Sequence, residues 1–306
     1  MKTKVSIIVP NYNHAQFLQQ RLDSIFNQSF QDFEVILLDD CSTDYSLQVL
    51  NKYKNHPKVS QFVVNKKNSG SPFVQWKKGI NLAKGEFIWI AESDDYCELD
   101  FLEKLLKHKD KADILYCQSF DVNEKGIEIY DRINYTSNFF KNIWYSNFQL
   151  KGKQFLSDYL IIKNVIPNAS AVIFKKKLIG KNIFSKELLQ MKMCGDWFFW
   201  IKIIDNANVY FLNNYLNYFR NHENISRKHI TIEMKRERLK EESLIRAFLC
   251  AQHGFKNKKA DIFLLKRWFN LFSYREILSS EFYSIKQCYQ SWLYFYYMYF
   301  KIKSRI

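Results

Sequence analysis

Glycine and proline are scarce in this 306-residue chain, with 8 and 4 residues respectively, which excludes collagen-like and low-complexity architectures. The six cysteines include no C-x-x-C pair, so neither a zinc site nor a disulfide framework is implied. The N-terminal apolar run, Val5–Val9, is too short for a signal peptide. No stretch reaches the roughly 18 apolar residues of a membrane-spanning helix. These absences favour a folded cytoplasmic protein.

Acidic residues are in short supply relative to basic ones. The chain has 46 Lys and Arg against 31 Asp and Glu, a formal net charge of +15. Such a balance attracts anions, whether nucleic acid, anionic lipid or phosphorylated small substrates. Hydrophobic residues make up 47% of the chain, which is enough for a packed core.

Short apolar, β-branched runs alternate with amphipathic segments along the chain. The pattern predicts strands at Val5–Val9, Phe33–Leu38, Val59–Val64, Phe87–Ala91, Asp113–Phe120, Ala171–Lys175 and Val209–Phe219. It predicts helices at Ser46–Tyr53, Pro72–Lys84, Leu99–Lys107 and Asp196–Asp205. Alternation of this kind indicates an α/β fold, with a mixed, mostly parallel sheet flanked by helices. From Thr231 the chain turns helical and basic, so we expect one domain over residues 1–228 and a helical extension over 229–306.

An acidic pair, Asp39-Asp40, follows the second expected strand. In open α/β sheets ligands bind outside the carboxyl ends of the strands, where a carboxylate can accept hydrogen bonds from a nucleobase or a ribose. An isolated Asp pair is also a common helix cap, and that alternative stays open.

A second acidic cluster, Glu92-Ser93-Asp94-Asp95, follows the expected strand at 87–91. Crowded carboxylates repel one another and raise their own pKa values unless a cation is bound. Oxygen ligands of this kind suit Mg²⁺ or Mn²⁺ held jointly with a substrate diphosphate. The alternative is an acidic loop that caps the next helix.

A third acid, Asp196, introduces a helix start that is almost wholly aromatic. Partial desolvation beside such a surface raises the pKa of a carboxyl group and makes it a better base. An ordinary helix N-cap is the competing interpretation.

Taken together, four segments in this order resemble the family 2 glycosyltransferases of the GT-A fold: VSIIVPNYNHAQFL, EVILLDDCSTD, AKGEFIWIAESDDY and CGDWFFWIKI. The resemblance covers residues 4–226. It implies inverting transfer of a sugar from a nucleotide diphosphate-sugar, first of all a UDP-sugar. The acceptor would be a hydroxyl of a glycan or a lipid-linked molecule in the synthesis of a bacterial surface polysaccharide, with Mn²⁺ or Mg²⁺ as cofactor.

The resemblance assigns a nucleotide site at the ends of the first two strands. Pro10 and Tyr12 match the residues that wall the nucleobase, and Asn13 belongs to the same turn. Asp40 matches the carboxylate that contacts the base, with Asp39 beside it as a structural partner.

The resemblance also assigns a metal site. Asp95 matches the metal-ligating acid, and Asp94 matches an acid that contacts the ribose or the metal. Glu92 stands where the family often has Asp, so it is a secondary ligand candidate. His222 matches a closing segment whose His or Arg reaches the metal or the diphosphate.

Three residues remain for the reacting groups. Asp196 matches the general base that removes the proton of the acceptor hydroxyl. Arg220, in the closing segment, and Lys78 are candidates for the diphosphate, because a cation matches phosphate charge. A solvated helix face is the alternative for Lys78.

Aromatic residues crowd the stretch 289–300, which is followed by Lys301, Lys303 and Arg305. Aromatic rings favour the membrane–water interface and cations favour anionic lipid, which predicts a peripheral contact at the inner face of the plasma membrane. Packing of these rings on the core or in a homodimer is the alternative.

Two other functions compete with glycosyl transfer. A non-catalytic sugar-nucleotide-binding scaffold would use the same fold. Nucleic-acid binding would use the basic balance, but the acidic clusters at the strand ends would repel a phosphate backbone, so we expect no nucleic-acid partner.

Overall fold

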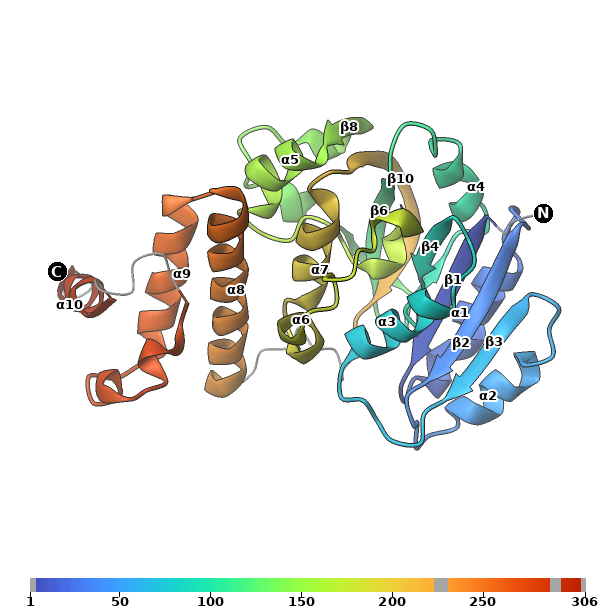
Figure 1. The fold of residues 1–306 in the computed structure, drawn as a ribbon, viewed down its shortest axis with the longest axis horizontal. Helices are drawn as coiled ribbons and strands as arrows, with labels where there is room; N and C mark the ends of the chain where they lie inside the picture. The colour runs from blue at the N-terminus through green and yellow to red at the C-terminus, as the bar shows by residue number, and fades with distance from the viewer. Residues whose placement is uncertain (1–3, 223–230, 287–292, 304–306) are drawn as a thin grey trace.

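A ten-stranded mixed sheet forms the centre of the computed structural model, which describes residues 4–222, 231–286 and 293–303 (Figure 1). Its main order is β3-β2-β1-β4-β9-β6-β10-β5, with β7 paired to β6 and β8 to β10. The strands are β1 (Val5–Asn11), β2 (Phe33–Asp39), β3 (Val59–Val64), β4 (Phe87–Ile90), β5 (Tyr96–Cys97), β6 (Ile114–Val122), β7 (Glu128–Asp131), β8 (Phe148–Lys151), β9 (Val172–Lys175) and β10 (Asn208–Arg220). β1 to β4 are parallel to one another, β6 and β10 are parallel, and β9 runs antiparallel between β4 and β6.

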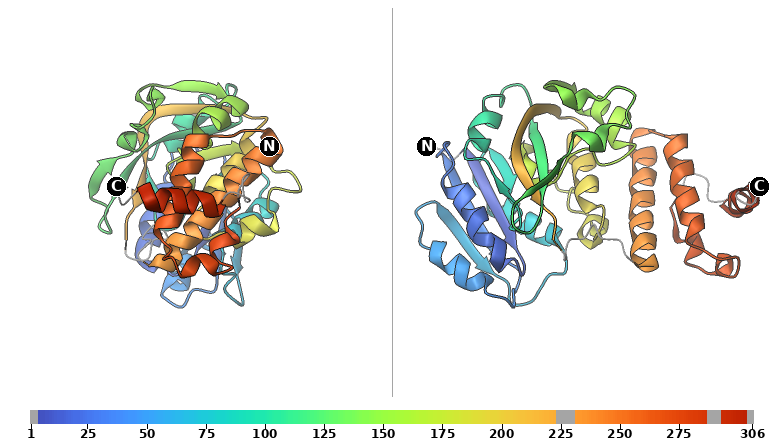
Figure 2. Two further views of the ribbon diagram at one scale, coloured as in Figure 1. Left: turned by 90° about the vertical axis from the view of Figure 1, so that its left-hand side faces the viewer. Right: turned by 180° about the vertical axis from the view of Figure 1, so that it is seen from behind.

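Helices cover both faces of the sheet, which is why β1, β2 and β4 are buried along their whole length (Figures 1 and 2). The helices are α1 (Ala15–Phe26), α2 (Ser46–Tyr53), α3 (Pro72–Leu82), α4 (Phe101–Leu106), α5 (Gly152–Phe155), α6 (Lys186–Gln190) and α7 (Gly195–Ile204). A π-helical turn spans Leu156–Leu160, and short 3₁₀ turns span Ile133–Thr136, Ile143–Tyr145, Ala169–Ala171, Lys176–Leu178, Glu276–Leu278 and Phe282–Ser284.

Alternate residues of the strands feed two apolar cores, one on each face. Ile7 packs with the helices α1, α2 and α4, and Ile8 packs with α3, α6 and α7. Helix α3 packs closely against Ile8 because Gly79 has no side chain. A Cβ at position 79 would lie 2.3 Å from Cγ2 of Ile8. The predicted α/β architecture is therefore confirmed, with β5, β7 and β8 as strands that the sequence pattern did not indicate.

A helical extension leads away from the sheet (Figures 1 and 2). It contains α8 (Ile232–His253), α9 (Lys258–Asn270) and α10 (Leu293–Lys303). Thr231 caps α8 by accepting a hydrogen bond from the backbone N of Met234, at 3.2 Å, and Gly254 ends it with φ +66. The predicted boundary at 228/229 lies outside the described residues.

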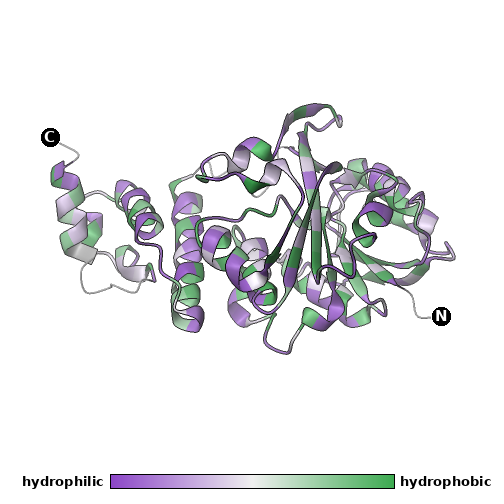
Figure 3. Cartoon of the chain, turned by 90° about the horizontal axis from the view of Figure 1, so that it is seen from above, coloured by the Kyte–Doolittle hydropathy of each residue, from purple (hydrophilic) through white to green (hydrophobic). Residues whose placement is uncertain are grey.

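The extension is joined to the rest of the chain through α8, whose Ile245 and Leu249 belong to the same core as α7. Farther out, Tyr297 of α10 is fully buried against Phe269 and Phe282. Hydrophobic and hydrophilic residues both occur along these helices (Figure 3). Among the described residues, no helix has the length and apolar character that crossing a bilayer requires.

Candidate active site

A cavity of about 860 Å³ lies beside the carboxyl end of β4. Its wall combines the segment after β4, the start of α3, the start of α7 and one residue of α8. Among the predicted site residues, Glu92, Asp94, Asp95, Asp196 and His222 line it. Three distant parts of the sequence thus meet at one hollow.

A group that can hold a metal ion stands at this cavity. Ligand atoms of His14, Asp94 and His222 all lie within 4.8 Å of one another, and no other such group of three occurs among the described residues. Nε2 of His222 lies 3.1 Å from Oδ2 of Asp94, and Nδ1 of His14 lies 2.8 Å from Oγ of Ser93.

The protonation states of this group suit a divalent cation. Burial works to raise the pKa of Asp94, but the hydrogen bond from His222 and the charge of His14 outweigh it and hold the pKa below its usual range. Burial lowers the pKa of His14, which favours the neutral form of its imidazole. An ionised carboxylate and neutral imidazole are the forms that bind metals.

Asp95 and Glu92, expected as metal ligands, do not belong to this group. Oδ2 of Asp95 accepts a hydrogen bond from Nδ2 of Asn168 at 2.6 Å, and Oδ1 accepts one from the backbone N of Arg220 at 3.0 Å. Oε1 of Glu92 accepts from Nε1 of Trp76 at 2.8 Å, and burial together with the charge of Asp94 raises the pKa of Glu92 to about 8. The role of Asp95 and Glu92 as ligands stays a prediction, while the distances bring together Asp94, His222 and His14, which the sequence did not single out.

Asp196 stands in the first turn of α7 and lines the cavity. Its Oδ2 accepts a hydrogen bond from Nδ2 of Asn164 at 2.9 Å, and its Oδ1 accepts one from the backbone N of Trp197 at 2.8 Å. Gly195 lets this turn approach α3, since a Cβ there would lie 2.2 Å from Cε2 of Phe73. The local packing thus fixes where the Asp196 carboxylate points.

The acidic pair at the end of β2 organises two loops. Asp40 accepts hydrogen bonds from Nδ2 of Asn65 at 2.6 Å, Oγ of Ser69 at 2.6 Å and Nε2 of Gln75 at 2.7 Å. Asp39 accepts from Nδ2 of Asn11 at 2.8 Å and from the backbone N of Ser42 at 2.9 Å. Both carboxylates fix the chain at the carboxyl ends of β1 and β2.

The turn after β1 lies beside them, because Asn11 pairs with Asp39 in the sheet. Asn13 has a left-handed φ of +56, and its Oδ1 accepts from the backbone N of Thr43 at 2.8 Å. Pro10 is buried, whereas Tyr12, just after the carboxyl end of β1, is 45% exposed. None of the expected nucleobase residues is among those that line the cavity.

Arg220 and Lys78, the two cations expected at the diphosphate, make hydrogen bonds to other parts of the chain. Nε of Arg220 donates to the backbone O of Asp94 at 2.7 Å, and Nη1 donates to that of Glu124 at 2.7 Å. The side chain is 1% exposed. Nζ of Lys78 donates to Oδ1 of Asn65 at 2.5 Å. Neither residue lines the cavity, and Arg220 is a structural residue of the loop that carries Asp94.

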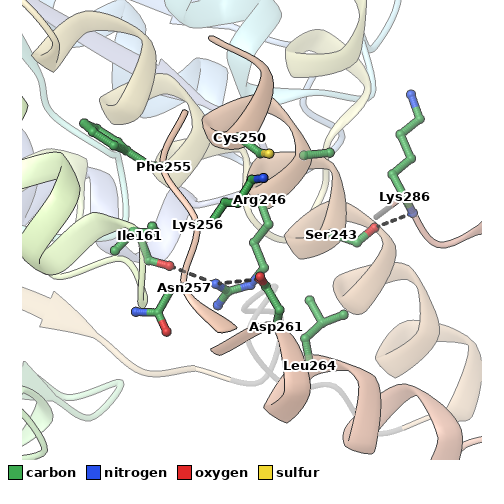
Figure 4. A pocket seen from close by; sticks show the side chains of 11 residues that line it. Ile161, Ser243, Arg246, Cys250, Phe255, Lys256, Asn257, Asp261, Leu264 and Lys286 are labelled. Carbon is green, nitrogen blue, oxygen red and sulfur yellow. Dashed lines mark hydrogen bonds and ion pairs between the residues drawn. The ribbon is translucent and has the colours of Figure 1, made fainter. Parts of the chain in front are cut away.

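A second, much smaller pocket of about 20 Å³ lies between α8, α9 and Ile161 (Figure 4). Arg246 crosses it and donates from Nη1 to the backbone O of Ile161 at 2.8 Å. Asp261 lies 3.7 Å from the same guanidinium nitrogen. This pocket is a packing contact between the extension and the rest of the chain.

Several known proteins are similar in sequence to this chain. The sequence model described as "Glycosyl transferase family 2" matches residues 6–177. Poly(ribitol-phosphate) beta-N-acetylglucosaminyltransferase TarS of Staphylococcus aureus is 37% identical over 130 residues, which are 40% of this chain and 22% of TarS. The enzyme TarP of the same organism, with the same catalytic description, is 30% identical over 223 residues, 71% of this chain and 62% of TarP. The chain thus spans less than two thirds of these relatives.

Solved structures show the same fold. The crystal structure of S. aureus TarS 1–349 in complex with UDP-GlcNAc has a TM-score of 0.59 at 19% identity, over 96% of this chain and 87% of that one. The mannosyltransferase PcManGT from Pyrobaculum calidifontis, in complex with GDP-Man and Mn²⁺, has a TM-score of 0.56 at 15% identity, over 99% and 87%. The predicted GT-A fold with a helical C-terminal extension is confirmed.

Proposed function

Since the chain belongs to the family 2 glycosyltransferases, we propose that it transfers a sugar from a nucleotide diphosphate-sugar to a hydroxyl of a glycan or lipid-linked acceptor. The observation that carries the proposal is the single cavity that holds both the His14–Asp94–His222 group and Asp196. The complex of TarS with UDP-GlcNAc supports a UDP-sugar as donor, and the polymer named for TarS supports a role in surface polysaccharide synthesis.

The metal of this reaction would be Mn²⁺ or Mg²⁺, held by Asp94, His222 and His14. When bound, such an ion neutralises the negative charge that develops on the departing nucleoside diphosphate. The Mn²⁺ in the related mannosyltransferase supports this assignment. Asp95 positions the loop that carries Asp94, through its bonds to Asn168 and to the backbone of Arg220.

Asp196 is the proposed general base. It takes the proton of the acceptor hydroxyl while the oxygen attacks the anomeric carbon from the side opposite the leaving group, which inverts the configuration. The hydrogen bond from Asn164 orients the carboxylate for this transfer.

The nucleobase is proposed to lie at the carboxyl ends of β1 and β2. The exposed ring of Tyr12 supplies a stacking surface there, and Pro10 and Asn13 shape the turn that presents it. Asp40 is close to this turn. Asp39, which pairs with Asn11 in the sheet and accepts a hydrogen bond from the backbone N of Ser42, holds the loop after β2.

The aromatic helix α10 supports a peripheral contact with the inner face of the plasma membrane. Phe295 and Tyr299 are 63% and 55% exposed, and Lys301 and Lys303 lie in the last turn of the same helix. Aromatic rings and cations in one exposed segment suit an anionic bilayer surface.

A panel of sugar nucleotides tests the central proposal. We expect one of them to raise the melting temperature in the presence of Mn²⁺, because a ligand that binds the native state stabilises it. Asp94→Asn should abolish the Mn²⁺-dependent part of the rise, whereas Asp110→Asn, which removes the same charge from an exposed position, should not. Wild-type protein that binds a sugar nucleotide but never hydrolyses or transfers it would instead be a non-catalytic scaffold.

A further inference from the structure

Helix α8 of the extension reaches the start of α7, where the proposed base lies. The carboxylate of Glu241 accepts hydrogen bonds from three successive backbone N atoms, those of residues 192–194, at 2.7, 3.0 and 2.6 Å. The side chain is 5% exposed. Glu241 is thus a positioning residue for the segment that leads into Asp196.

One turn before Glu241 on the same helix, Arg238 lines the cavity. Its Nη1 lies 3.2 Å from Sγ of Cys194, two residues before Asp196. Burial works to lower the pKa of Arg238, but negative groups around it raise the pKa overall, so the guanidinium keeps its charge. The extension therefore places a permanent cation beside the proposed base.

Arg238 has no ion-pair partner among the residues that the structure describes. Glu242, one turn further along α8, is held by Arg246 at 2.9 Å and by Arg267 at 2.7 Å. Arg238 lines the cavity without a direct ion pair to a described residue, so an anion bound there can pair with its guanidinium.

Other cations of the cavity wall separate into two kinds. Arg132 is neutralised by Asp121, with its Nη2 at 3.0 Å from Oδ2 and its Nε at 2.5 Å from Oδ1. Lys192 lines the cavity, is exposed, and makes no ion pair with a described residue. Among the described residues of this wall, Arg238 and Lys192 are thus the lysine and arginine side chains that make no ion pair.

We infer that Arg238 and Lys192 form a subsite for an anionic group of the acceptor, a phosphodiester or a carboxylate. The inference rests on the proposed transfer reaction. It assigns the anion to the acceptor because Arg238 stands next to the segment of Asp196, which takes the acceptor proton, while the donor diphosphate is placed at His14, Asp94 and His222. A guanidinium suits either anion, since its fork matches two oxygens.

Kinetics with paired acceptors test this subsite in the full-length protein, with Mn²⁺ and the donor found by the panel. One pair is a ribitol phosphate oligomer and ribitol, and the other is a methyl glucuronide and the methyl glucoside. Arg238→Gln should raise the KM for a charged acceptor about tenfold or more and the KM for its neutral counterpart less than about twofold. Arg238→Lys should fall between, and Lys235→Gln, an exposed charge on the same helix, should change neither. The urea midpoint of each variant controls for folding.

If Arg238→Gln raises the KM equally for charged and neutral acceptors, or does not raise it, the subsite is refuted. A rise confined to the KM of the donor would mean that Arg238 binds the donor, and it would also refute the subsite. If none of the four acceptors is glycosylated, titration of the ribitol phosphate oligomer and the methyl glucuronide into Asp196→Asn protein with UDP and Mn²⁺ decides. Binding that Arg238→Gln abolishes supports the subsite, and binding of neither compound refutes it. Absence of Mn²⁺-dependent donor hydrolysis in the wild type would reject the transferase itself, whereas hydrolysis without charge discrimination would reject only the subsite.

Discussion

Gly195→Ala tests how the start of α7 is held, and we expect it to lower the free energy of unfolding by about 1–3 kcal/mol. A Cβ at this position would lie 2.2 Å from Cε2 and 2.3 Å from Cζ of Phe73, closer than the 3.0 Å that real contacts respect. Phe73 is buried and packs edge-on against Trp76 with a centroid distance of 4.9 Å, so a ring displaced toward the cavity gives up this contact. Alanine favours a helix over glycine by up to about 1 kcal/mol, so a net loss reports the clash.

Urea unfolding followed by tryptophan fluorescence measures this loss. The same substitution should lower kcat by about 10²-fold if it shifts the neighbouring Asp196 by about 1 Å. Turnover and stability should therefore fall together in this variant.

A second substitution separates the clash from other effects. Phe73→Leu removes Cε2 and Cζ, so Gly195→Ala should cost almost nothing in that background, with a coupling energy of about 1–3 kcal/mol. Gly180→Ala is the matched control, because no heavy atom lies within 4 Å of its Cβ position, and its effect should stay within about 0.5 kcal/mol. Additive effects in the double variant, or an unchanged Gly195→Ala protein, would refute the reasoning.

Three further predictions concern other residues. Asp196→Asn should keep nucleotide binding by calorimetry but lower kcat about 10²- to 10⁴-fold, and a wild-type rate would remove Asp196 from the base role. Burial works to raise the pKa of Glu242, but two arginines outweigh it and lower the pKa, so its stabilisation is present above the unfolded pKa and is lost as the pH falls through the folded value. Glu242→Gln should therefore cost about 3–5 kcal/mol at pH 7 and much less near pH 3 by urea unfolding, and a pH-independent cost would contradict this origin. Phe295→Ser with Tyr299→Ser should reduce co-sedimentation with phosphatidylglycerol vesicles, and a wild type that stays in the supernatant would disprove the membrane contact.

Much of the sheet could be predicted because its central strands are covered on both faces. Every residue of Val5–Asn11 and Phe33–Asp39 is buried, and the resulting apolar runs stand out in the sequence. Glu128–Asp131 and Phe148–Lys151 gave no such signal, because they are polar, partly exposed strands whose place is set by pairing with β6 and β10. Their strand character depends on the rest of the sheet.

The site was predictable only in part, for a related reason. Asp94, Asp196 and His222 stand in segments whose local pattern matches the family, and all three line the cavity. His14 has no pattern of its own: it reaches Asp94 because β1 pairs with β4, which the sequence does not state. Knowledge of the strand order would have placed the turn after β1 beside the loop after β4.

The buried guanidinium of Arg220 has a consequence for ligand binding. It connects the end of β10 with the backbone O of Asp94, the turn at Asn123 and Glu124, and Gln20 of α1. One side chain thereby holds four separate parts of the chain together. The loop of Asp94 is thus preorganised, and a ligand spends little of its affinity on ordering it. A lysine at position 220 could not make these hydrogen bonds, because its single ammonium group cannot reach acceptors on several sides as the three guanidinium nitrogens do.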